Sequence, residues 1–175
     1  MLQNAGAIVF TPRERDWQTE EIVVDNDDAV KSIFYEETVN GKKWKDCDSL
    51  GFANPKASLI DGENPFRMGT VRQAKATKKR KSFSTVSYQP KFREAGKYAV
   101  YVSYQTLPKS VKDAKYIVYH KGEKTVFTVN QRMGGGTWVY LGTFDFDRGC
   151  NEFNRVVCTN QASSRGIVTT DAVRF

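Results

Sequence analysis

Apolar and polar residues alternate with a period of two along most of this chain. In the stretch KYAVYVSYQ (97–105), Tyr98, Val100 and Val102 share one face, and Ala99 and Tyr101 lie on the other. This period is typical of a pleated β-strand with one buried face. Similar alternation, or a high content of β-branched and aromatic residues, predicts strands in residues 21–27, 29–37, 81–90, 116–120, 125–131, 137–146, 151–160 and 167–175.

Turn signals separate these strands. Residues 116–120 and 125–131 are joined at KGEK, which predicts a β-hairpin with Gly122 at positive φ. Three consecutive glycines, 134–136, separate the second arm from the next strand. The sequence therefore predicts a series of short antiparallel strands.

Two stretches depart from this pattern. Residues 67–79 have weak helical spacing. Residues 42–74 are rich in Gly, Asn, Asp, Pro and Ser, which predicts loops, and a connection of this length is often functional.

Short strands with turn signals every eight to twelve residues or so are typical of sandwiches and barrels. We predict an all-β fold, an antiparallel β-sandwich of jelly-roll or galactose-binding-like type, with a closed barrel as the alternative. Aromatic residues fill the space between the sheets of a sandwich, and we expect Trp138, Phe144 and Phe146 to do so here.

Composition indicates one folded domain. The chain has 175 residues, of which 39% are hydrophobic and 13% aromatic, above the range of disordered chains. Its net charge is +7, and much of this excess of positive charge lies in the run KATKKRK (75–81). We interpret this run as a solvated loop flank, with polyanion binding as the lesser alternative. Because no RNA-binding motif, zinc finger or basic recognition helix accompanies it, we expect no specific nucleic-acid partner.

The three cysteines do not indicate a disulfide framework. Cys150 and Cys158 bracket CNEFNRVVC, and a straight strand would hold them too far apart to bridge. Whether they are bridged stays open, and small buried thiols are the favoured interpretation for both and for Cys47.

Catalytic groups are sparse in this sequence. His120 is the sole histidine and no GxSxG motif is present, so we expect no catalytic residues and no cofactor. The stretch VVDNDDA fails the calcium-loop template because Ala29 and Val30 occupy its fifth and sixth places. We predict no metal site, although a structural calcium near Asp25 and Asp171 stays open.

Aromatic residues outside the core are the better candidates for ligand contact, because sugar C–H faces stack on such rings. Trp44 lies in the polar loop region, and Tyr104 lies at a strand end. With Arg132, which follows a strand, they are our candidate ligand-binding residues.

From residue 20 to the end the sequence resembles the golvesin C-terminal-like domain, a module also found in xanthan lyases. The matching segments are IVVDND, EAGKYAVYVSY, YIVYHKGEKTVFTVNQRMGGGTWVYLGTF and GIVTTDAVRF. The resemblance implies a non-catalytic β-sandwich attached to polysaccharide or cell-wall enzymes, with adhesion or carbohydrate binding as its role.

Residues 1–19 resemble something else. LQNAGAIVFTPRERD is similar to the helix end and second strand of zinc N-acetylmuramoyl-L-alanine amidases, without that family's metal ligands. We expect residues 1–19 to be the remnant of a flanking catalytic domain or a linker strand, and 20–175 to be the sandwich.

These features predict a non-catalytic module that positions an attached cell-wall or polysaccharide hydrolase on glycan, either peptidoglycan or an acidic polysaccharide, and the net charge of +7 suits an acidic polymer. The alternative is a structural insert that covers or orients a neighbouring amidase site, and a third hypothesis makes the chain itself a lyase or hydrolase. The sequence contains neither a membrane-spanning run nor a signal peptide, and it begins abruptly. We expect it to belong to a longer protein and to be extracytoplasmic, whether periplasmic, secreted or on the cell surface.

Overall fold

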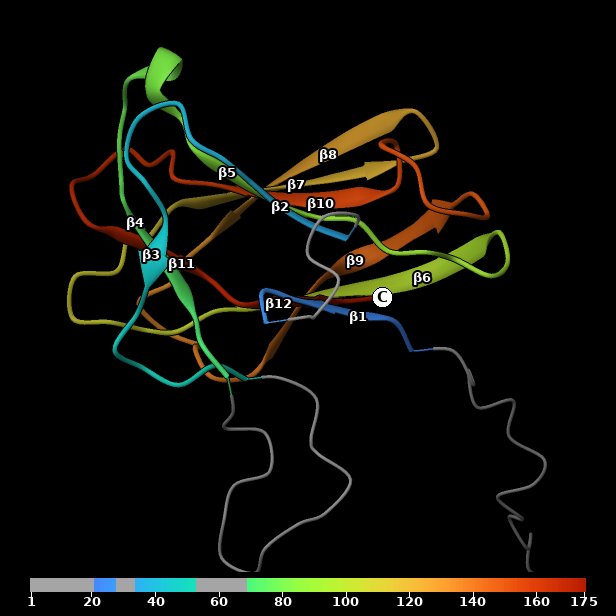
Figure 1. Ribbon diagram of the computed structural model, residues 1–175, viewed down its shortest axis with the longest axis horizontal. Coiled ribbons are helices and arrows are strands. Elements are labelled where there is room, and N and C mark those ends of the chain that lie inside the picture. Colours follow the sequence, from blue (N-terminus) through green and yellow to red (C-terminus); the bar gives the residue numbers. More distant parts are fainter. Residues whose placement is uncertain (1–20, 28–33, 53–68) are drawn as a thin grey trace, which may run out of the picture.

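The computed structural model describes residues 21–27, 34–52 and 69–175, and most of their regular structure is β-strand (Figure 1). Two sheets form the layers of a sandwich, and a smaller sheet lies beside them. All paired strands within these sheets are antiparallel, which confirms the predicted antiparallel β-sandwich.

One layer is a four-stranded sheet in the order β1-β12-β6-β9. Along β6, Val100 and Val102 are fully buried, whereas Tyr101 between them lies on the outer face. The alternation in the sequence therefore sets which residues enter the core. The bounds of its strands are β1 Val23–Asp25, β12 Ala172–Arg174, β6 Gly96–Ser103 and β9 Trp138–Phe146.

The other layer is a five-stranded sheet in the order β2-β5-β10-β7-β8. Tyr88, Val156 and Val118 lie opposite one another across β5, β10 and β7, and all three are fully buried. They form one row of the interior that faces the four-stranded sheet. The bounds of its strands are β2 Tyr35–Thr38, β5 Thr85–Tyr88, β10 Arg155–Thr159, β7 Ala114–His120 and β8 Glu123–Val129.

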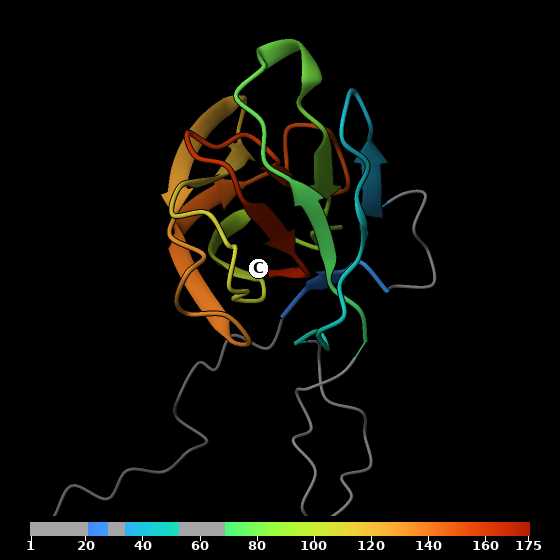
Figure 2. The ribbon, with the colours of Figure 1, turned by 90° about the vertical axis from the view of Figure 1, so that its left-hand side faces the viewer.

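The third sheet consists of three short strands in the order β11-β4-β3, with bounds β11 Ile167–Thr170, β4 Arg72–Lys75 and β3 Lys45–Asp46. The chain leaves it at Asp171 and enters β12 of the four-stranded sheet directly. Figure 2 views the molecule from the side on which this small sheet lies. The 3₁₀ turn η3 (Arg80–Ser82) precedes β5.

Sequence predictions of turns are confirmed where glycine is required. β7 and β8 form the expected hairpin, in which Lys121 and Gly122 have φ of 44° and 78°. Two successive positive φ values match the tight turn that suits the strand twist. Gly135 is needed for a different reason, because a Cβ there would lie 2.2 Å from the Thr106 amide nitrogen.

Three expectations need correction. The weak helical spacing of residues 67–79 was misleading, because residues 72–75 form β4. The predicted loop region 42–74 likewise contains β3 and part of β4, while its residues 53–68 lie outside the described residues. Phe146 is fully buried as expected, but Trp138 is half-buried on the outer face, where it packs on Phe52 and Arg174.

The segment that enters the sandwich and the segment that closes it lie side by side. The Ile22 amide donates to the Phe175 carbonyl at 3.1 Å, and the Phe175 amide donates to the Ile22 carbonyl at 2.9 Å. Residues 1–19, with the amidase-like segment, lie outside the described residues. In the part of the chain that is described, no helix has the length and apolar character to cross a membrane.

Candidate functional site

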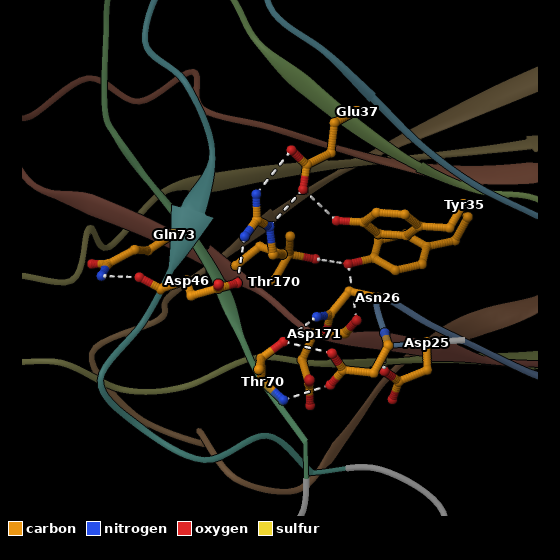
Figure 3. Close-up of polar contacts among 12 residues, drawn as sticks. Asp25, Asn26, Tyr35, Glu37, Asp46, Thr70, Gln73, Thr170 and Asp171 are labelled. Atoms are coloured by element: carbon orange, nitrogen blue, oxygen red, sulfur yellow. Dashed lines mark hydrogen bonds and ion pairs between the residues drawn. The ribbon is translucent and has the colours of Figure 1, made fainter. Parts of the chain in front are cut away.

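A polar pocket opens at one edge of the sandwich, between the turn that follows β1, the edge strand β2 and the small sheet (Figure 3). Its volume is about 580 Å³, within the range of small-ligand sites. We call it the Arg72 pocket. Most of its polar lining comes from Asp27, Glu36, Glu37, Asp46, Thr70 and Arg72.

Arg72 at the start of β4 is held by acidic residues from two other strands. Its Nε and Nη2 donate to the two carboxylate oxygens of Glu37 on β2, at 2.6 and 3.1 Å. Its Nη1 donates to Asp46 on β3. The hydrogen bond to Glu37 is the main reason why the pKa of Arg72 lies above its ordinary value. The guanidinium is therefore a fixed, permanently charged donor at the centre of the pocket.

Tyr35 forms the inner wall of this pocket. Its ring is 7% exposed and contacts Tyr88 edge-on, and its hydroxyl donates to Glu37 at 2.6 Å. Burial, followed by this hydrogen bond, raises the pKa of Tyr35. The phenol therefore stays a neutral donor, and Glu37 receives hydrogen bonds from both Tyr35 and Arg72.

The opposite wall is the turn after β1. The Thr70 hydroxyl donates to Asp27 at 2.7 Å, and the Asn26 amide lies 2.8 Å from the same hydroxyl oxygen. The Asp27 backbone amide donates in turn to Asp25 at 2.8 Å. These contacts fix the turn against the strand that carries Arg72.

Asp171 lies beneath this turn and is 1% exposed. Its Oδ2 accepts from the Phe52 amide at 2.7 Å and from the Ser103 hydroxyl at 2.8 Å. Burial raises the pKa of Asp171 to about 6 despite these hydrogen bonds. Among residues 21–27, 34–52 and 69–175, no group of three or more His, Cys, Asp or Glu side chains is arranged to hold a metal ion.

The candidate ligand-binding residues lie apart from the Arg72 pocket. Trp44 is 4% exposed and Tyr104 is 2% exposed, so both rings belong to the core in this conformation. The Tyr104 hydroxyl donates to the Met133 carbonyl at 2.7 Å. Arg132 is exposed, and its Nε donates to the Ser110 carbonyl at 3.1 Å. Their part in ligand binding stays a prediction.

The histidine and the cysteines lie outside the Arg72 pocket, and the contacts found for them are packing and hydrogen-bond contacts. His120 lies 2.9 Å from the Thr125 hydroxyl and packs on the ring of Phe144. All three cysteines are free, and burial raises the pKa of Cys158 to about 12. The open question of a Cys150–Cys158 bridge is thereby answered for this conformation.

The acidic and basic lining of the Arg72 pocket was not found from the sequence. Arg72 and Asp46 lie in the stretch expected to be loops, and Glu37 was expected only as an acidic strand end. Their sequence separations of 26 and 35 residues leave no local motif. The pairing of β3 with β4 brings Asp46 to Arg72, and the position of the small sheet beside β2 brings Glu37 to it.

Chemically, the pocket offers a rigid array of acceptors and donors. A carboxylate oxygen has two lone pairs, so Glu37 Oε2 and Asp46 Oδ1, each of which accepts one hydrogen bond from Arg72, keep acceptor capacity for a ligand hydroxyl. Glu37 Oε1 already accepts from both Arg72 and Tyr35. Because the carboxylates of the pocket outnumber its single guanidinium, the pocket repels anions. A neutral ligand with several hydroxyl groups suits such an array better.

A family model, the Golvesin C-terminal domain, matches residues 64–175. A xanthan lyase from Bacillus sp. (strain GL1) is 33% identical over 97 residues, which cover 54% of this chain and 10% of that protein. The structure of a Paenibacillus xanthan lyase has a TM-score of 0.65 at 23% identity, covering 88% of this chain and 12% of that one.

A further similar structure is the C-terminal CBM6 of LamC, a laminarinase from Zobellia galactanivorans, with 12% identity, a TM-score of 0.48, and coverage of 89% of this chain and 98% of that one. The chain spans about a tenth of the length of the xanthan lyases that it matches. Since the family model covers well over half of its residues, the chain belongs to the Golvesin C-terminal domain family.

Proposed function

We propose that this chain is a non-catalytic carbohydrate-binding module that positions an attached polysaccharide- or cell-wall-degrading enzyme on its glycan. The observation that carries the proposal is the Arg72 pocket, in which Glu37 and Asp46 hold one guanidinium in an open polar cavity. Sugar hydroxyls both donate and accept, so they match a lining of fixed carboxylates and N–H groups.

The similarity to a segment of xanthan lyases supports this role. Xanthan lyase names an enzyme that acts on a polysaccharide, and the matched segment is a small share of that protein. A module of this size attached to such an enzyme would raise its local concentration on the polymer. An extracytoplasmic location follows from the proposal, because polymers of the cell wall and its surroundings lie there.

The pocket favours binding over bond cleavage. Glu37 and Asp46 both receive hydrogen bonds from Arg72, and Glu37 also receives one from Tyr35. Because both carboxylates are held in these contacts, their geometry suits orienting a ligand rather than attacking one.

The test is a binding titration of the chain against soluble peptidoglycan fragments, xanthan and a neutral β-glucan, with an Arg72→Lys variant. Lysine keeps the charge but cannot make the paired contact with Glu37. We expect the variant to lose at least about tenfold in affinity, about 1.4 kcal/mol, while Arg148→Lys on an exposed loop changes little. Equal affinities of wild type and Arg72→Lys, with both folded by circular dichroism, would remove the pocket from the proposal.

The three residues expected from sequence enter the same titration. Substitution of Arg132 by Gln tests its exposed side chain directly. Trp44→Phe and Tyr104→Phe make smaller changes within the core, and their affinities are compared at a temperature at which circular dichroism shows both variants to be folded.

A second candidate is a structural insert that covers or orients a neighbouring amidase domain. The paired backbone of Ile22 and Phe175 favours it, since a domain with adjacent ends fits within a surface loop of another. This candidate predicts no affinity for any glycan of the panel and a stable contact with the rest of the protein.

A further inference from the structure

Five segments that are distant in sequence meet at one end of the sandwich, the end that faces the viewer in Figure 2. The segments are residues 39–45, 75–84, 104–113, 130–137 and 160–166. They follow or precede the strands of all three sheets at this end. We call this surface the cationic end.

Backbone contacts join the first, second and fifth of these segments. The Ala76 amide donates to the Gly166 carbonyl at 2.9 Å, and the Thr77 amide donates to the Asn160 carbonyl at 2.9 Å. At Gly41 the backbone lies so close to η3 that a Cβ would be 2.7 Å from the Ser82 carbonyl oxygen.

The third and fourth segments are attached to the fifth. The Ile167 amide donates to the Lys109 carbonyl at 2.8 Å, next to Gly166. Arg132 contacts Ser110 through its Nε, and the Gln131 amide donates to the Val111 carbonyl at 3.1 Å. The five segments therefore form one continuous surface.

Charge is distributed very unevenly between this end and the rest of the chain. The five segments contain twelve of the 27 Lys and Arg residues and one of the 20 acidic residues, Asp113. The other residues hold fifteen Lys and Arg against nineteen Asp and Glu. The net charge of +7 is thus the sum of a strongly basic end and a mildly acidic remainder.

These cations are available to a ligand. Each lysine of the five segments is exposed, as are Arg132 and Arg165. The ion pairs found among the described residues join Arg72 with Glu37 and Asp46, and Arg174 with Glu21, so none of them involves a lysine of this end. The lysines at this end are Lys42, Lys43, Lys45, Lys75, Lys78, Lys79, Lys81, Lys109 and Lys112.

Folding brings these like charges together at a cost, because the repulsion among them is weaker in the extended chain. An anionic polymer offsets that repulsion and releases its own counterions on binding, so its affinity depends strongly on salt. The surface has the form expected for such a ligand, since several short segments present cations in one area.

The chemistry of the surface favours a polysaccharide over nucleic acid. Proteins that bind single-stranded nucleic acid combine cations with exposed aromatic rings on which bases stack. The aromatic residues of these segments are Trp44 and Tyr104, which are buried, and Phe83, which is half-buried. Lysines also predominate over arginines, and lysine acts as a point charge rather than as a bidentate phosphate clamp.

We propose that the cationic end binds an acidic polysaccharide, one with repeating carboxylate groups such as uronic acids, through the lysines of residues 42–45 and 75–81. This surface is separate from the Arg72 pocket, whose lining is mainly acidic. The pocket contacts sugar hydroxyls, and the cationic end contributes charge attraction along the polymer. A test of the cationic end can therefore succeed or fail independently of the pocket.

The experiment compares two triple variants that remove the same charge. Lys78→Gln/Lys79→Gln/Lys81→Gln alters the cationic end. The control, Lys91→Gln/Lys97→Gln/Lys124→Gln, removes three exposed lysines from outside the five segments. Affinity for polygalacturonate is measured between about 20 and 200 mM NaCl, with dextran as neutral polymer and single-stranded DNA as a further arm.

We expect the variant of the cationic end to lose about tenfold or more in affinity for polygalacturonate at low salt. The slope of log affinity against log salt should fall by about one for each lysine that contacts the polymer. The control variant should change affinity less than about threefold, and dextran binding should be the same for all three proteins. Sulfated dextran distinguishes carboxylate from sulfate as the bound group.

Equal losses in the two triple variants would overturn the proposal, because net charge alone would then explain the binding. Absence of polygalacturonate binding by the wild type, or tighter binding to DNA, would also overturn it. Because the substituted lysines are exposed, both variants should keep the wild-type melting temperature. Arg72→Lys separates the two surfaces, since it should leave the salt slope unchanged.

Discussion

Asp171 should make the chain more stable in mild acid than at neutral pH. It is 1% exposed at the junction of β11 and β12, and burial raises its pKa to about 6. In the unfolded chain an aspartate has a pKa of about 3.9. The native state therefore binds the proton more tightly, and the stability conferred by the protonated form is lost as the pH rises from about 4 through 6.

The size of this effect follows from the two pKa values. Their difference corresponds to about 3 kcal/mol between low pH and pH 7, and about 1 kcal/mol of it is regained on moving from pH 7 to pH 5. Asp171→Asn removes the titration while its side-chain oxygen can still accept from Phe52 and Ser103. The free energy of unfolding of the variant should then lack this part of the pH dependence.

Urea unfolding at pH 5 and pH 7 measures the effect, and subtracting variant from wild type cancels the other titrating groups. We expect this difference to change by about 1 kcal/mol in favour of the wild type at pH 5. Asp48→Asn removes the same charge from an exposed position and serves as control. A difference for Asp171→Asn that is constant between the two pH values would refute the reasoning.

Three further predictions concern the fold. Gly135→Ala should destabilise the chain well beyond Gly96→Ala, because the new Cβ meets a backbone nitrogen at 2.2 Å in the first case and only a ring carbon of Tyr98 at 3.9 Å in the second; equal melting temperatures would contradict this. Alkylation of the native protein should label Cys158 last, since it is fully buried with a pKa of about 12, and peptide mass spectrometry reports the order. Trp44→Ala should cost about 3–5 kcal/mol of stability by urea unfolding, as expected for a core aromatic, and a loss below about 1 kcal/mol would place the ring outside the core.

The sequence carried enough information for the architecture of the layers. Alternation along residues 97–105 placed Val100 and Val102 on the same face of a strand, and both are buried; Gly122 marked the hairpin. These features are local, since strand period and turn conformation depend on neighbouring residues. The small sheet was missed because β3 and β4 are short and lie in a polar stretch.

The candidate surfaces were harder to predict because they depend on strand pairing. Trp44 was expected to be a surface ring, yet the pairing of β3 with β4 places it in the core. Arg72 and its carboxylates come from three strands of two sheets. The run at residues 75–81 was visible as a basic segment, but the loops that lie beside it could be known only from the folded chain.

The central claim is that this chain binds a polymer of sugars without cleaving it. Titration calorimetry of the chain with xanthan and with soluble peptidoglycan, followed by gel filtration of the same samples, tests it most directly. We predict saturable binding of at least one polymer, with its length distribution unchanged. Heats of dilution alone for both polymers, or a shift of either polymer to shorter lengths, would contradict the account.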